Sequence, residues 1–195
     1  MNKRYLTLLL FGLLALTQLY VPAHLILDQQ DVLTTGKEYK FQLAPVDPSD
    51  PFRGKYITLQ YKHNSFVIPD ARQWQSGELV YVVLHKDPAG FARIRQVSKE
   101  KPRGPVDYIK TRVTYVAKDA ELKNTLFIDY PFDRYYLEES KALPAEQAYT
   151  ASLRDSSQVT YALVRIKAGN AVLQEVLIGG IPIREKVKAA ALRQP

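Results

Sequence analysis

The stretch QVTYALVRIKAGNAVLQEVLI, residues 158–178, is the clearest β-hairpin signal in the chain. Two runs rich in apolar and β-branched residues, 158–167 and 171–178, flank the short connection Ala-Gly-Asn. Such runs joined by a short glycine-containing connection are typical of paired antiparallel strands. The stretch therefore predicts an antiparallel sheet, and the rest of the chain can be interpreted around it.

Six further segments between residues 39 and 130 have the same character, with apolar residues that alternate with polar ones or form short buried runs. Turn sequences rich in Pro, Gly or charged residues separate them, such as KDPAG at 86–90. We expect one antiparallel, mainly β domain of about eight to ten strands, built as a partly open barrel or a two-layer sheet. The six segments are YKFQLA (39–44), KYITLQY (55–61), ELVYVVLHK (78–86), GFARIRQVS (90–98), VDYIKTRVTYVA (106–117) and TLFIDY (125–130).

Helical patterns are few in this part of the chain. The segment PAEQAYTASLRD, residues 144–155, spaces its apolar residues three and four apart, and Pro144 suits a first helical turn. The last residues, 184–195, are basic and predict a short helix or a frayed tail.

The N-terminal region has a different composition. YLTLLLFGLLALTQLYVPAHLIL, residues 5–27, contains no charged side chain other than His24 when protonated. As a helix it would be about 34 Å long, enough to cross a hydrocarbon core of about 30 Å. A cleaved signal peptide is the alternative, but Val21-Pro22-Ala23 is a poor cleavage site and the apolar run continues beyond it, so we favour an uncleaved anchor.

The charges that flank this segment predict its orientation. Lys3 and Arg4 precede it, whereas Asp28 and Asp31 follow it. The positive-inside rule then places the N-terminus in the cytoplasm and the domain outside it. We expect a transmembrane anchor at 1–27, a juxtamembrane linker at 28–38, an extracytoplasmic β-rich domain at 39–183 and a basic tail at 184–195.

Composition excludes several classes of site. There is no cysteine, so disulfides and thiolate metal sites are absent, and only three histidines occur. The net charge of +7 comes from charges that alternate in sign, without the basic cluster of a nucleic-acid surface. No glycine-rich phosphate loop or dinucleotide fingerprint occurs, so we predict no cofactor.

The segment APVDPSDPFRGKY, residues 44–56, leads into the second predicted strand and contains prolines that restrict its backbone. Each proline restricts the aspartate before it, and Asp47 and Asp50 can hold a turn through their own backbone. Gly54 permits positive φ or a close backbone approach. The segment is either a structural corner or, with Arg53 and Tyr56, a surface for a ligand or partner. Calcium at the two aspartates is a weaker alternative because the domain is basic.

Residues 45–61 resemble the signature of the GDYXXLXY family of bacterial membrane-anchored proteins, in which a DPxDxxRGDY loop leads into a strand. Lys55 replaces the family's Asp, which favours a structural role for the motif. DRYYLEES, residues 133–140, is similar to a second, aromatic segment of the family. The matching positions are Asp47, Pro48, Asp50, Arg53, Gly54, Tyr56, Leu59 and Tyr61, and then Tyr135, Tyr136, Glu139 and Glu146.

The resemblance implies a bacterial inner-membrane protein with one span and a periplasmic domain, and a multi-span membrane protein as its partner. We therefore expect a binding or assembly module, with Tyr56, Tyr135 and Tyr136 as contact aromatics. The alternative is an envelope hydrolase that uses the paired carboxylates of Glu139 and Glu146. An enzyme is the less favoured interpretation, because no nucleophile with an adjacent base is evident.

Overall fold

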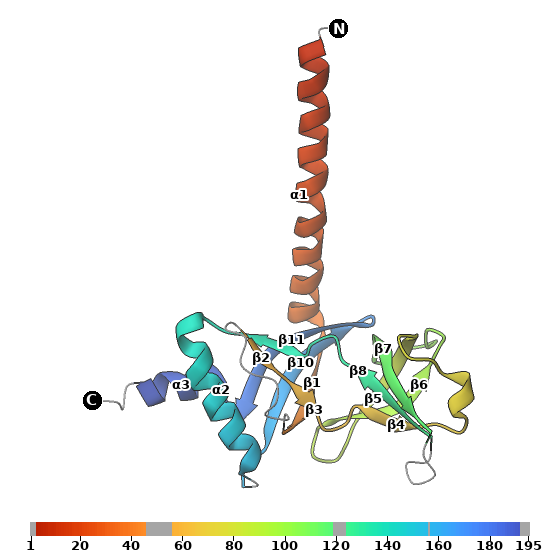
Figure 1. Cartoon of the computed structure of the whole chain (residues 1–195), viewed down its shortest axis with the longest axis vertical. Helices are drawn as coiled ribbons and strands as arrows, with labels where there is room; N and C mark the ends of the chain where they lie inside the picture. Colours follow the sequence, from red (N-terminus) through yellow and green to blue (C-terminus); the bar gives the residue numbers. More distant parts are fainter. Residues whose placement is uncertain (1–2, 46–55, 119–123, 156, 192–195) are drawn as a thin grey trace.

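The computed structural model describes residues 3–45, 56–118, 124–155 and 157–191 (Figure 1). A single long helix, α1 (Lys3–Thr35), stands away from a head built of strands and two shorter helices. From Tyr5 to Leu27, the large apolar side chains of α1 that the structure describes are exposed, as expected for a segment whose surroundings are not protein.

The apolar part of α1 meets the requirements for a membrane span. Residues Thr7–Thr35 are long and apolar enough to cross a bilayer by length and composition, and the head buries none of the apolar window. The whole helix is about 50 Å long at 1.5 Å per residue, which exceeds a hydrocarbon core of about 30 Å. This supports association with a membrane through one span.

The end of α1 is attached to the head. Residues 28–35, which we predicted as part of a linker, form the last turns of α1 instead. Val32 is buried, and Lys167 Nζ contacts both carboxylate oxygens of Asp31 at 2.6 and 2.8 Å and Thr35 Oγ1 at 2.8 Å. These contacts attach the polar end of α1 to the head, so the helix is joined directly to the domain.

The first sheet contains the predicted hairpin and confirms it. All its strand pairs are antiparallel. Its strands, in spatial order, are β12 (Ile181–Pro182), β11 (Asn170–Ile178), β10 (Thr160–Lys167), β1 (Lys37–Ala44) and β3 (Gln60–Tyr61).

The turn of this hairpin has a specific backbone geometry. Lys167 pairs with Asn170, which leaves a two-residue turn at Ala168 and Gly169. Both have positive φ, 51° and 92°, as a type I′ turn requires. Gly169 also forms a bridge to Ile109 in the second sheet.

The second sheet is also antiparallel and lies beside the first (Figure 1). A further bridge joins Lys40 of β1 to Phe91, so the strands together form a nearly closed, barrel-like arrangement. A short 3-10 helix, η1 (Ala71–Gln73), precedes the strand that begins at Leu79. In spatial order the strands are β4 (Ser65–Val67), β8 (Thr125–Asp129), β7 (Tyr108–Ala117), β5 (Leu79–Lys86) and β6 (Ala92–Ser98).

The predicted strand at 55–61 divides into two because it changes partner. β2 (Tyr56–Thr58) pairs with β9 (Arg134–Tyr136), whereas β3 pairs with β1. Between them, the Leu59 amide donates to the Asp133 carbonyl at 2.7 Å. This division, together with the short strands β4, β9 and β12 that lie outside the predicted segments, gives the described chain more, and shorter, strands than we predicted.

An aromatic cluster fills the core beneath β1 and β3. It consists of Phe41, Tyr61, Tyr130 and Phe132, with ring centroids 5.1–5.8 Å apart and mostly edge-to-face. The two tyrosines satisfy their hydroxyls by donating to backbone carbonyls, Tyr61 to Phe132 at 2.7 Å and Tyr130 to His63 at 2.8 Å. The cluster can therefore be dry without an unpaired hydroxyl on either ring.

Two helices cover one end of the first sheet (Figure 1). α2 (Glu139–Arg154) begins five residues before the helix that we predicted, so Pro144 lies inside it rather than in its first turn. Proline there removes one amide donor, but Ala142, Ala145 and Tyr149 on the same helix are buried, and this packing offsets the loss. α3 (Ile183–Ala191) packs beside α2 and buries Ile183 and Val187.

Asp107 joins the two sheets close to α1. It accepts from Lys37 Nζ and from the Tyr39 hydroxyl, both at 2.6 Å. Burial acts to raise the pKa of Asp107, but the hydrogen bonds from Lys37 and Tyr39 outweigh it and the pKa is lowered. The ionised form is thus the one that the fold binds.

Asp107→Asn should therefore destabilise the head at neutral pH by about 1 kcal/mol, since Lys37 is largely exposed and the pair is screened. Because the folded pKa lies below the unfolded one, this contribution is present above the unfolded value and is lost as pH falls through the folded value. Melting temperatures of both proteins, measured from pH 7 to pH 2, should converge at the acid end. A difference that stays constant with pH would contradict this assignment.

Candidate functional site

The two sequence motifs meet in space. β2 carries the end of the first motif and β9 carries the second, and they pair so that Tyr56 lies opposite Tyr136 and Ile57 opposite Tyr135. Segments almost eighty residues apart therefore form one two-stranded sheet.

This sheet presents a small aromatic surface, which we define as Tyr56, Arg134 and Tyr136. The two rings are 5.6 Å apart between centroids, and the Arg134 guanidinium lies 5.1 Å from the centre of the Tyr56 ring. Tyr136 is 59% exposed, which is high for a large aromatic side chain. A cation stacked on paired tyrosines offers a partner both apolar area and charge.

Tyr135 does not belong to this surface, although we predicted it as a contact aromatic. Strand alternation turns its ring inward and leaves it only 3% exposed. Its hydroxyl donates to Glu175 and accepts from Arg184 Nε at 2.7 Å. Burial, and then the hydrogen bond to Glu175, raise the pKa of Tyr135, so the phenol stays neutral and serves as a structural link between β9, β11 and α3.

Two further residues of the first motif lie in the core. Leu59 and Tyr61 are buried on the same face as Ile57, as the alternation predicted. Asp47, Asp50, Arg53 and Gly54 lie outside the described residues, so their proposed binding role stays a prediction.

The two predicted carboxylates lie on one helix. Glu139 is the first residue of α2 and is exposed, whereas Glu146 is partly buried two turns later. Burial raises the pKa of Glu146. The helical rise separates their backbones by about 10 Å, and seven residues place both on the same side of the helix. The paired-carboxylate hydrolase stays a prediction.

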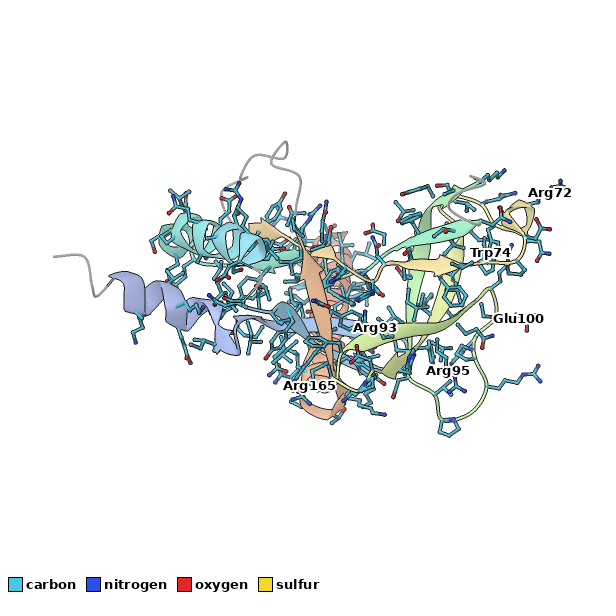
Figure 2. All side chains as sticks on the ribbon, turned by 90° about the horizontal axis from the view of Figure 1, so that it is seen from below. Arg72, Trp74, Arg93, Arg95, Glu100 and Arg165 are labelled. Atoms are coloured by element: carbon cyan, nitrogen blue, oxygen red, sulfur yellow. The ribbon has the colours of Figure 1, made fainter. Side chains whose placement is uncertain are left out.

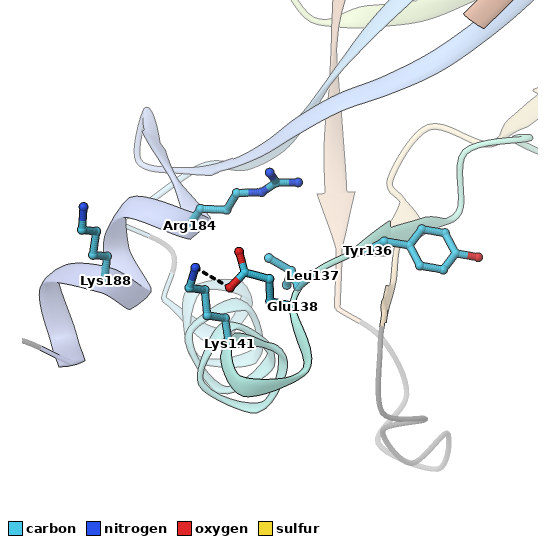
Figure 3. A pocket seen from close by; sticks show the side chains of 6 residues that line it. All are labelled: Tyr136, Leu137, Glu138, Lys141, Arg184 and Lys188. Carbon is cyan, nitrogen blue, oxygen red and sulfur yellow. Dashed lines mark ion pairs between the residues drawn. The ribbon is translucent and has the colours of Figure 1, made fainter. Parts of the chain in front are cut away.

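A cavity of about 300 Å³ opens beside these residues, where α2 and α3 begin (Figure 3). The ion pair from Lys141 Nζ to Glu138 lies at its centre, at 2.7 Å. Hydrogen bonding from Lys141 lowers the pKa of Glu138, which therefore remains ionised. We call this the cationic cavity; its lining residues are Tyr136, Leu137, Glu138, Lys141, Arg184 and Lys188.

Sequence patterns had not indicated Arg184 or Glu175 as neighbours of the second motif. A β-bulge between β10 and β11 shifts the register, so that Leu163 pairs with Glu175 and Val164 with Leu173. The extra residue, Gln174, changes the direction of the side chains that follow it. Within the described parts of the chain, no three His, Asp or Glu side chains are grouped to hold a metal ion.

Comparison with known protein families gives one result that agrees with the motifs. Residues 18–176, from within α1 to within β11, match the family described as GDYXXLXY protein. Comparison with curated proteins and with solved structures found no match. Because the matched region covers most of its length, the chain belongs to the GDYXXLXY protein family.

Proposed function

We propose that this chain is a single-span protein of the bacterial inner membrane whose head lies in the periplasm and binds another membrane protein. The cations before the apolar segment and the acidic residues after it support this orientation. Helix α1 acts as an uncleaved anchor and holds the head at the membrane surface.

The observation that carries the proposal is the aromatic surface of Tyr56, Arg134 and Tyr136. Tyrosine and arginine are enriched among the residues that dominate interface energies. β2 lies toward the side of the head from which α1 leaves, a position that a membrane-embedded partner can reach (Figure 1). The exposed Tyr136 ring is the contact that we expect to matter most.

Tyr136→Ala should weaken association by about 2 kcal/mol, roughly thirtyfold, because it removes the exposed ring at this surface. The measurement is the recovery of a stoichiometric membrane partner with the tagged full chain from detergent extracts. The melting temperature should change little, since Tyr136 is mostly exposed.

Tyr115→Ala is the matched control. Tyr115 is a similarly exposed tyrosine, 50% exposed, but it stacks on Phe127 in the second sheet, away from the aromatic surface. Partner recovery should survive this change. Equal loss with both variants, or a wild-type protein that purifies alone, would contradict the proposal.

A further inference from the structure

The cationic cavity contains more positive than negative charge. Arg184, Lys141 and Lys188 line it, and Glu138 is its one lining carboxylate. Glu175 lies 3.9 Å from Arg184 Nε, so it offsets only part of the excess. Among the described residues, no carboxylate lies within ion-pair distance of Lys188.

The cations are also accessible. The side chain of Arg184 is 57% exposed, its Nε donates to the Tyr135 hydroxyl at 2.7 Å, and its guanidinium carbon lies 5.3 Å from the centre of the Tyr135 ring. In Figure 3, the Tyr136 ring points away from Arg184, Lys141 and Lys188. The cavity adjoins the first turns of α2 and α3, whose partial positive charge adds to that of the side chains.

The position of the cavity indicates where an anion would come from. The first turn of α2 lies on the side of the head from which α1 leaves (Figure 1). About 13 Å of helix separates Leu27, the last apolar residue of the span, from Gly36 at the head. Lipid headgroups extend about 5–8 Å beyond the hydrocarbon core, so roughly 5–8 Å remain between them and Gly36. Tilt of α1 and the length of extended Arg and Lys side chains have to close this distance.

We propose that the cationic cavity binds the phosphate of an anionic lipid headgroup, with Arg184 and Lys188 as the principal contacts and Lys141 in support. The inference rests on α1 spanning the bilayer and is independent of the protein partner. A bound headgroup would fix the rotation of the head about α1, because it adds a second attachment to the membrane away from the helix.

The test uses the full chain in dodecylmaltoside with three probes: dioctanoyl phosphatidylglycerol, dioctanoyl phosphatidylcholine and inorganic phosphate. Wild type should bind phosphatidylglycerol in preference to the other two, measured by calorimetry. A cation at an anionic lipid surface contributes about a factor of five in affinity. Lys188→Gln should therefore weaken binding about fivefold, and Arg184→Gln with Lys188→Gln about 25-fold.

Arg72→Gln with Arg95→Gln is the matched control, since both side chains are exposed and lie at the opposite end of the head (Figure 2). Binding should be unchanged in this variant. If removal of Arg184 disturbs folding because its hydrogen bond to Tyr135 is lost, the single variant Lys188→Gln still tests the site. If the cavity variants and the control variant bind phosphatidylglycerol equally well, the proposed site is wrong. If inorganic phosphate binds as tightly as phosphatidylglycerol, the ligand is free phosphate and not a lipid headgroup.

Discussion

Phe41→Ala should lower the melting temperature of the head by about 10 °C. Phe41 is 3% exposed and contacts Tyr61, Tyr130 and Phe132 at centroid distances of 5.1–5.8 Å. Truncation of a buried phenylalanine costs about 3–5 kcal/mol, since contacts are lost and a cavity remains. For a chain of this size each kcal/mol corresponds to roughly 2–4 °C.

Phe41 packs together segments that are far apart in the sequence, so its truncation weakens the contacts between them. The ring joins β1 to the β3 strand and to the segment after β8, which are held together by few backbone pairs. Thermal melts in detergent, followed by near-ultraviolet circular dichroism, should show loss of the tyrosine signal at the lower temperature. Phe127→Ala is the control, because this ring is only partly buried on the face of the second sheet. A smaller shift for Phe41→Ala than for Phe127→Ala would refute the central role of the cluster.

Much of the fold was predictable because the decisive signals are local. The hairpin at 158–178 combines residues suited to strands with a turn that needs positive φ, and both properties are visible in the sequence. The end of α1 was not predictable in this way. Its last two turns are mostly polar, which is typical of a linker. Their contacts with the head come from distant parts of the chain, such as Lys167, which is 136 residues away from Asp31 in the sequence.

The candidate site was predictable only in part, for a related reason. Alternation places Tyr135 and Tyr136 on opposite faces, but the sequence alone does not say which face is buried. That choice depends on the pairing of β9 with β2 and on the bulge at Gln174, which brings Glu175 within reach of the Tyr135 hydroxyl. Both are long-range features, and the position of Arg184 depends on them in turn.

Gly36→Ala should destabilise the junction between α1 and the head by about 3 kcal/mol. A Cβ at this position would lie 2.3 Å from the Val32 carbonyl oxygen and 3.2 Å from the backbone nitrogen and oxygen of Ile166. All three atoms belong to the backbone, so no side chain can move aside. The last turn of α1 must separate from β10, which would strain the Gly36 hydrogen bond to Val32 at 2.8 Å and the contacts of Lys167 with Asp31.

The same substitution should loosen the helix relative to the head, and this can be measured separately from stability. The chain has no cysteine, so spin labels placed at Gln30→Cys and Ser65→Cys would report one distance between α1 and β4. Its distribution should broaden in Gly36→Ala. Gly12→Ala is the matched control, since nothing lies within 4 Å of a Cβ there. If Gly36→Ala leaves both the distribution and the melting temperature as they are in Gly12→Ala, then Gly36 does not limit the approach of α1 to β10, and the attachment of the helix depends on its other contacts with the head, such as buried Val32 and the pair of Lys167 with Asp31.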